Sequence, residues 1–248
     1  MLNQTVVASF DPEVNWTYEA GYKSSLFGGR VLADVAIFYI DWTDIVIPQT
    51  FEEIDGVPLG LPVALSTNAG DATVKGTEVS LQAALTDELT LQVGGSWSDA
   101  NYEEAKITTF ATWPSFYPDG DVSGNALLRQ SEWQGNASLT WRHPVTPVWA
   151  FYTRGDALYQ SEQFVGADNE SEIPARTTVN LRLGLDSDTF QVELWTENLF
   201  DEDAPTGAFR DVYFNNTPNG TTSAPGDFFA WRMSVSQPRR TTYGVTAS

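Results

Sequence analysis

Residues 177–198 read TTVNLRLGLDSDTFQVELWTEN, and apolar and polar residues alternate along both halves of this stretch. In the first half, the apolar positions are Val179, Leu181, Leu183 and Leu185. In the second half, they are Phe190, Val192 and Leu194. Asp186-Ser187-Asp188 lies between the halves and is typical of a tight polar turn. Because successive side chains of a strand point to opposite faces, the stretch predicts a β-hairpin with one apolar and one polar face.

The same period-two alternation recurs along the chain and predicts about nine strands of about ten residues each. Further hairpins are expected over residues 132–160, 74–102 and 16–39, with a last strand over 243–247. Short turns are expected near 27–29, 86–88, 143–147 and 186–188. Long connections are expected over 43–66, 103–131, 161–173 and 200–236. Short turns at one end of the strands and long loops at the other are typical of transmembrane β-barrels.

Aromatic residues gather at both ends of the apolar faces, with aliphatic residues between them. On the loop side they are Trp16, Tyr18, Tyr39, Trp97, Trp133 and Tyr159. On the turn side they are Tyr22, Trp141, Trp149 and Phe190. Two such belts match the two interfaces between water and lipid. A soluble sandwich, in which the same alternation faces a protein core, is the alternative interpretation.

The composition excludes several classes of function. The chain has 248 residues, 33 acidic and 13 basic side chains and a net charge of -20, which argues against binding nucleic acid or anionic lipid through a basic surface. It has no cysteine, so disulfides and thiolate chemistry are excluded. No apolar run reaches the roughly 18 residues of a membrane helix. The first residues lack a signal peptide, so we expect a mature or truncated chain.

The sequence predicts no catalytic, cofactor-binding or metal-binding residues, and the chain is not expected to be an enzyme. Asp119-Gly120-Asp121 lacks the remaining ligands of a calcium loop and is interpreted as an acidic turn. His143 is the only histidine and lies in an expected turn, where a structural role is favoured.

Nine charged residues fall on the polar faces of the expected strands and would point into the lumen of a barrel. They are Glu19, Lys23, Glu78, Arg142, Arg154, Asp156, Arg182, Glu193 and Glu197. Hydration or pairing across the inner wall is the simplest role for any one of them.

A set of motifs follows in a characteristic order over residues 12–23, 35–39 with 41–42, 68–70 with 75–78, 122–125, 192–201 and 238–248. The most specific of them is Val192-Glu193-Leu194-Trp195-Thr196-Glu197-Asn198-Leu199-Phe200-Asp201. Through these motifs, and over nearly its whole length, the chain resembles the C-terminal barrel of TonB-dependent receptors. The resemblance implies an all-β fold, an antiparallel transmembrane β-barrel segment with short periplasmic turns and long extracellular loops. The family's barrel has about 22 strands around an N-terminal plug.

Nothing in residues 1–248 resembles the plug or the short segment that engages TonB, and about nine strands is an odd number, whereas bacterial single-chain barrels have an even one. We therefore expect the chain to be the C-terminal barrel portion alone, without the plug and the N-terminal strands.

The resemblance implies active transport across the outer membrane of a Gram-negative bacterium, of a scarce large nutrient such as a ferric siderophore, cobalamin or an oligosaccharide. The implied partners are outer-membrane lipid, the nutrient, and the TonB complex acting through the plug; no cofactor is expected. Candidate ligand-binding residues in the long loops are Trp113, Phe116, Tyr117, Phe209, Arg210, Tyr213, Phe228, Phe229 and Trp231. A soluble β-sheet binding protein and a small passive porin are the alternatives.

Overall fold

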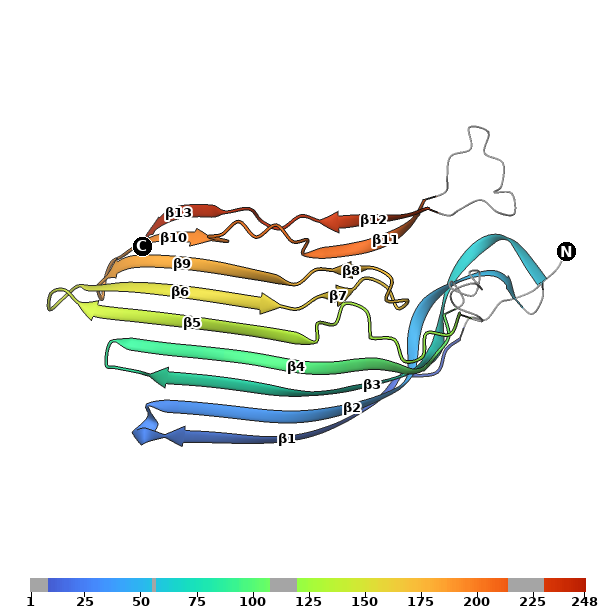
Figure 1. Cartoon of the computed structure of the whole chain (residues 1–248), viewed down its shortest axis with the longest axis horizontal. Helices are drawn as coiled ribbons and strands as arrows, with labels where there is room; N and C mark the ends of the chain where they lie inside the picture. Colours follow the sequence, from blue (N-terminus) through green and yellow to red (C-terminus); the bar gives the residue numbers. More distant parts are fainter. Residues whose placement is uncertain (1–8, 55–56, 108–119, 214–229) are drawn as a thin grey trace.

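The computed structural model describes residues 9–54, 57–107, 120–213 and 230–248. In this part of the chain, nine strands form one antiparallel sheet in the order β1-β2-β3-β4-β5-β6-β9-β10-β13. Their bounds are β1 (Val14–Leu26), β2 (Val31–Ile54), β3 (Val57–Ala84), β4 (Leu89–Ala105), β5 (Trp133–Pro144), β6 (Ala150–Gln160), β9 (Arg176–Asp186), β10 (Gln191–Glu197) and β13 (Thr242–Ala247). Figure 1 shows them side by side, from β1 at one edge to β13 at the other. The expected all-β barrel segment is confirmed as an open sheet.

Two small hairpins interrupt the order of the strands. β7 (Gln163–Phe164) pairs with β8 (Glu172–Ile173) between β6 and β9. β11 (Gly207–Tyr213) pairs with β12 (Ala230–Ser236) between β10 and β13. Both hairpins lie at the end of the sheet that carries the long loops, which we call the loop end (Figure 1). Among the described residues, no helix is both long and apolar enough to cross a membrane.

The strand register aligns the apolar positions into one continuous face, as the alternation predicts. Leu139 of β5 lies opposite Leu91 of β4 and Gly155 of β6, and Gly155 in turn lies opposite Leu181 of β9. Large side chains on this face remain exposed, including Tyr22 (67%) and Leu194 (54%). We call it the apolar face and the opposite side the polar face. A single sheet with an uncovered apolar face differs from a sandwich, in which a second sheet would bury that face.

The opposite end, which we call the turn end, has three turns of the same design. In each, a Thr or Ser hydroxyl accepts hydrogen bonds from the backbone N–H groups two and three residues later. Thr86 accepts them from Glu88 (3.1 Å) and Leu89 (3.0 Å). Thr146 and Ser187 form the equivalent bonds in the turns that follow β5 and β9. These side chains fix the reversal of direction, as expected of Ser and Thr in tight turns.

The first turn has another design. It is a short 3-10 helix, η1 (Phe27–Gly29), in which Gly28 and Gly29 have positive φ angles of 68° and 90°. Glycine adopts these angles without steric cost, so the two adjacent glycines explain the reversal there.

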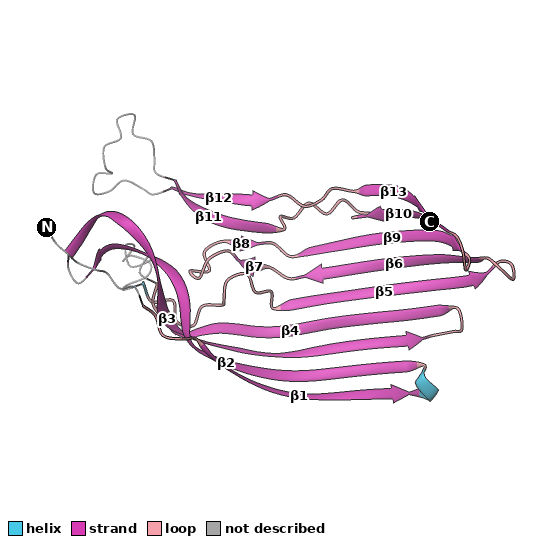
Figure 2. Ribbon diagram, turned by 180° about the vertical axis from the view of Figure 1, so that it is seen from behind, coloured by secondary structure: helices cyan, strands magenta, loops and turns pink. Residues whose placement is uncertain are grey.

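The expected long connection over residues 43–66 is wrong. β2 and β3 remain paired through this region as far as Ile54 and Val57, and Figure 2 shows the paired extension bending away from the sheet. The register shifts after Trp42, where Asp44 has a φ of 58° and its N–H donates to Asp71 Oδ1 at 2.9 Å. This bulge breaks the period-two alternation from which strands are predicted. The sequence pattern therefore ends near Asp44, although the pairing of β2 with β3 continues beyond it.

Candidate functional site

The nine charged residues assigned to a barrel lumen all lie on the polar face. Arg154, for example, lies opposite Thr140 on one side and Arg182 on the other, and Glu78 lies opposite Ser96. The polar face is therefore the surface on which a barrel segment would meet whatever fills the barrel. That these residues face a lumen stays a prediction.

Near the turn end, the polar face carries a network that links three strands. Tyr152 of β6 donates its hydroxyl proton to Glu193 Oε2 of β10 at 2.5 Å and accepts a hydrogen bond from Gln191 Nε2 at 2.8 Å. The ring reaches across β9 because Gly184 lies beneath it: a Cβ at Gly184 would overlap the ring atoms of Tyr152. An aromatic side chain that covers a cross-strand glycine fixes strand register.

A second link in the same region joins β5 to the end of β9. Arg142 Nη1 donates to Asp186 Oδ2 at 2.7 Å, and β6 lies between the two strands. Together with the Tyr152 network, this ion pair ties β5, β6, β9 and β10 to one another, although Asp186 Oδ1 is buried without a hydrogen-bond partner among the residues described. We call these two links the closed network.

The next facing pair on the polar face, toward the loop end, is Arg154 and Arg182, and these two side chains have fewer partners within the chain. Arg154 binds Asp156 of its own strand through Nη2 at 2.7 Å. Arg182 is exposed, and no hydrogen bond or ion pair joins it to any other residue that the structure describes. Both arginines line a hollow of about 390 Å³ together with Gln92, Ser138 and Asn180.

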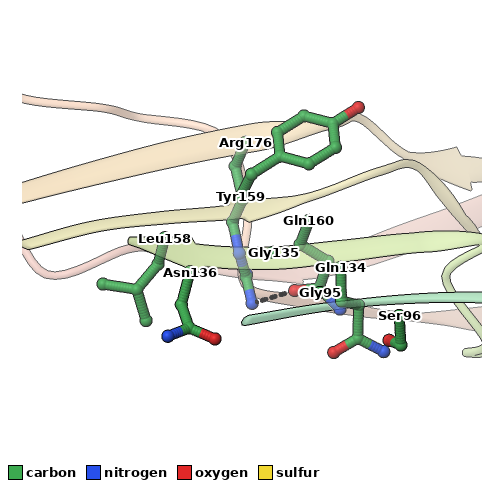
Figure 3. Close-up of a pocket in the computed structure, with 9 residues that line it drawn as sticks. All are labelled: Gly95, Ser96, Gln134, Gly135, Asn136, Leu158, Tyr159, Gln160 and Arg176. Carbon is green, nitrogen blue, oxygen red and sulfur yellow. Dashed lines mark hydrogen bonds between the residues drawn. The ribbon is translucent and has the colours of Figure 1, made fainter. Parts of the chain in front are cut away.

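A neighbouring hollow of about 350 Å³ lies toward the loop end and is shown in Figure 3. Ser96, Gln134 and Asn136 line it, with Gln160 and Arg176 beyond them. Arg176 Nη2 donates to Gln160 Oε1 at 2.5 Å across β9 and β6. The polar face thus has two adjacent depressions whose walls carry both hydrogen-bonding side chains and apolar atoms, with Leu158 lining both.

At the loop end, two connections form one hydrogen-bonded unit. Asn125 Nδ2 donates to the carbonyl of Ala167 at 2.8 Å, and the N–H of Ala126 donates to Asn169 Oδ1 at 2.7 Å. The side chain of Asn169 returns a hydrogen bond to the carbonyl of Ala126 at 3.0 Å. Beneath them lies a small buried cluster that draws on β2, β3, β4 and both connections: Ile45, Ala72, Tyr102, Ala105, Ile107, Val122 and Ala167.

Only part of the predicted ligand-binding set can be located. Phe209 and Arg210 lie on β11, where the backbone pairs them with Ser234 and Met233 of β12. Tyr213 pairs with Ala230, and Trp231 with Val212. Trp113, Phe116, Tyr117, Phe228 and Phe229 lie outside the described residues. Their role in ligand binding stays a prediction.

Comparison with known proteins decides the family. Residues 2–199 match the family described as "TonB dependent receptor-like, beta-barrel". The chain belongs to this family. The predicted resemblance to TonB-dependent receptors is confirmed.

Solved structures share the fold of this TonB-dependent receptor barrel. The ferric yersiniabactin uptake receptor FyuA from Yersinia pestis is 16% identical with a TM-score of 0.66, over 95% of this chain and 29% of that one. The siderophore receptor PiuA from Acinetobacter baumannii is 14% identical with a TM-score of 0.63, over 94% and 28%. The copper transporter OprC is 13% identical with a TM-score of 0.59, over 96% and 31%. The chain therefore spans less than a third of the length of each of these proteins.

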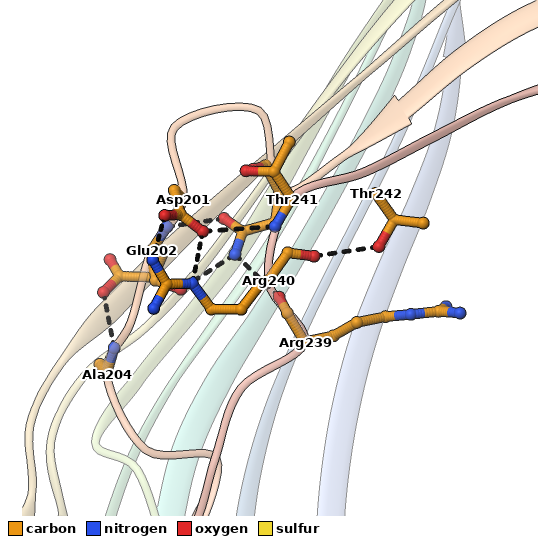
Figure 4. Close-up of polar contacts among 8 residues, drawn as sticks. Asp201, Glu202, Ala204, Arg239, Arg240, Thr241 and Thr242 are labelled. Atoms are coloured by element: carbon orange, nitrogen blue, oxygen red, sulfur yellow. Dashed lines mark hydrogen bonds and ion pairs between the residues drawn. The ribbon is translucent and has the colours of Figure 1, made fainter.

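The most specific segment of the family resemblance ends in a structured corner, shown in Figure 4. Asn198 is buried, has a positive φ of 51°, and donates through Nδ2 to the carbonyls of Glu202 and Arg239, each at 2.9 Å. Arg240 forms a two-pronged ion pair with Asp201. This ion pair, with the hydrogen bond from the N–H of Thr241, lowers the pKa of the Asp201 carboxyl from 3.8 to about 2. The corner of the TonB-dependent receptor barrel thereby joins β10 to the approach to β13.

The two other polar features of the sequence have structural partners. His143 Nδ1 lies 2.9 Å from Glu88 Oε1, across the end of the β4–β5 pair. Asp121 accepts hydrogen bonds from the N–H (3.0 Å) and hydroxyl (2.6 Å) of Ser123, as an acidic turn does. Within the described ranges, no group of three or more His, Asp or Glu side chains is placed to hold a metal ion.

Proposed function

We propose that this chain is the C-terminal barrel portion of an outer-membrane receptor that imports a scarce nutrient with energy supplied through TonB. The observation that carries the proposal is the nine-stranded sheet, which has a continuous apolar face for lipid and a charged polar face for the interior. The family match over residues 2–199 supports the same assignment. In this proposal the plug and the remaining strands lie outside residues 1–248, and the chain itself catalyses no reaction.

Physical chemistry supports a larger barrel. Within the part of the chain that the structure describes, β1 and β13 each have only one neighbour in the sheet, so each presents a row of unpaired backbone groups. Hydrocarbon offers no hydrogen-bond partner to such groups, and each group left without one costs roughly several kcal/mol. Additional strands beside β1 and β13 would remove both edges and enclose the polar face.

A ferric siderophore is the cargo that we favour. FyuA is a ferric yersiniabactin uptake receptor and PiuA is a siderophore receptor, whereas OprC is a copper transporter. Cobalamin and oligosaccharides are the other candidates that the family resemblance implies.

The test is uptake of radioactive iron by cells grown without iron and supplied with a panel of ferric siderophores. We compare the parent strain with a strain that lacks the gene, with and without a proton gradient across the inner membrane. Uptake of one siderophore complex should require both the gene and the gradient. Gene-dependent uptake that survives collapse of the gradient would support the passive porin instead.

A further inference from the structure

We infer that a hollow on the apolar face, over β3, β4 and β5, binds one acyl chain of a membrane lipid in a fixed position. This inference rests on the proposed function, because only a sheet that stands in a membrane meets lipid. It goes beyond that function by naming one place where lipid is bound as a ligand, whereas the rest of the apolar face meets lipid as a solvent.

The first observation is the hollow itself, which has a volume of about 320 Å³. Pockets for small molecules have volumes of roughly 300–1,000 Å³, so the hollow is large enough for part of a lipid chain. Its floor lies at Gly95 of β4, and its walls include Thr77 and Val79 of β3, Trp97 of β4 and Trp133 of β5. The strand register places these five residues on the apolar face.

The second observation is that two glycines keep the hollow open. Gly95 lies opposite Gly135 of β5, and neither has a positive φ angle, so the backbone does not require glycine at these positions. A Cβ at Gly135 would meet one backbone oxygen at 3.7 Å, and a Cβ at Gly95 one at 3.3 Å. Gly184 on the polar face differs, because the ring of Tyr152 covers it. What covers Gly95 therefore comes from outside the described chain.

The third observation is the order of side chains along the apolar face. Toward the turn end the face is aliphatic, as at Leu91. At the hollow, Trp97 faces Trp133 with ring centroids 6.3 Å apart. The next facing pair toward the loop end is Lys75 and Asp99, joined by an ion pair at 3.0 Å. Aliphatic groups, then indole rings, then charges match the order of a lipid from its tail to its headgroup.

The fourth observation is that the chain itself holds the aromatic wall in place. Trp97 Nε1 donates to Glu132 Oε1 at 2.8 Å, and Trp133 is 53% exposed, which leaves the hollow open to the membrane. An acyl chain that enters gains dispersion contacts with both rings and with the backbone, which a flat part of the face does not offer. Because the hollow is already formed, binding spends little free energy on ordering the protein.

The experiment maps the contacts of a lipid probe with the complete receptor in nanodiscs. The nanodiscs contain phosphatidylethanolamine and phosphatidylglycerol, with a trace of phosphatidylcholine that carries a diazirine in its acyl chain. Light releases N₂ from the diazirine, and the resulting carbene inserts into a bond of the nearest side chain. Mass spectrometry then measures the yield of adducts along the apolar face.

Two variants separate the hollow from the rest of the face. Gly95→Leu fills the hollow. Gly155→Leu is the matched control, because it adds the same side chain to the same face at a position where nothing lies within 4 Å of a Cβ. Val79→Trp fills the hollow from β3 and serves as a second test that leaves Gly95 unchanged.

We expect adducts to concentrate at Trp97 and Trp133 in the parent and in Gly155→Leu, and to fall several-fold in Gly95→Leu and in Val79→Trp. Equal yields along the whole apolar face, or a yield at Trp133 that neither filling variant lowers, would overturn the inference, because lipid would then be only a solvent. Fewer adducts at the hollow than elsewhere would also overturn it, because a protein surface would then cover the hollow.

The same data distinguish this inference from the proposed function. Any of the overturning patterns in a receptor that still shows energised uptake leaves the proposed function intact. Absence of lipid adducts from the entire apolar face would overturn both, because the sheet would then not stand in the membrane.

Discussion

The middle of the sheet and its loop end are stabilised by different means. In β4, β5, β6, β9 and β10, the strands pair in regular register, and large side chains of the apolar face, such as Leu139 and Leu194, remain exposed. At the loop end, the connections are held by amide and hydroxyl side chains that bind backbone groups, as Asn125, Asn169 and Asn198 do. The stability of the middle strands therefore depends on which face each side chain occupies. The stability of the loop end depends instead on individual polar residues.

This difference explains what each region tolerates. A residue in the middle strands can be exchanged for another of the same polarity, because the strand register and the polarity of each face stay the same. A capping amide such as Asn169 or Asn198 has no equivalent, because both its donor and its acceptor are used. The following predictions test this contrast in the receptor that carries the chain.

The largest effect is expected on the apolar face. Leu181→Arg places a charge in lipid and should cost about 2–4 kcal/mol of folding free energy near the bilayer midplane. Thr178→Arg, which lies on the polar face, is the matched control and should cost far less. The measurement is urea-induced unfolding of the receptor in lipid vesicles, followed by tryptophan fluorescence. Equal losses for the two variants would show that the faces are assigned wrongly.

Asn198→Ala should have the next largest effect. It removes the two amide hydrogen bonds to the carbonyls of Glu202 and Arg239. Each such bond contributes about 0.5–1.5 kcal/mol, so the loss should be about 1–3 kcal/mol. Asn136→Ala is the control, because Asn136 is exposed and makes no hydrogen bond to another described residue. The same unfolding assay applies. A loss at Asn136 as large as at Asn198 would contradict the capping role.

The sequence predicts the middle strands of the sheet better than it predicts the loop end. Alternation predicts the two faces because strand periodicity is a local property. It does not predict that residues 43–54 stay paired, because a bulge at Asp44 shifts the alternation. The hydrogen bond between Asn125 and Ala167 joins residues 42 positions apart, so it leaves no local pattern. The repeated Thr or Ser at 86, 146 and 187 is a signal that could have identified the turn design from the sequence.

Gly184→Ala tests the closed network and should cost about 1 kcal/mol, close to the net value of one hydrogen bond. A Cβ at this position must displace the ring of Tyr152, and the hydroxyl then loses Glu193. Gly155→Ala is the control, since nothing lies within 4 Å of a Cβ built there. Unfolding of both variants in vesicles gives the comparison. If Gly155→Ala proves the more harmful, the ring does not depend on the glycine beneath it.

The smallest effect should appear at the corner formed by Asp201 and Arg240. The pKa of Asp201 is lowered to about 2 in the folded chain, against an ordinary value of 3.8. A carboxyl whose pKa is lower when folded contributes stability that is present above about pH 4 and is lost as the pH falls toward about 2. Because the ion pair is exposed, solvent screens it and the loss should be small. We expect cleavage of the 198–206 segment by pepsin, which is active in acid, to accelerate over this pH range. Asp201→Asn should be cleaved rapidly throughout the range, whereas Asp203→Asn, which leaves the bonds to Arg240 in place, should behave like the parent. If the rate of cleavage depends on pH in the same way for the parent and for Asp201→Asn, this ion pair does not stabilise the corner.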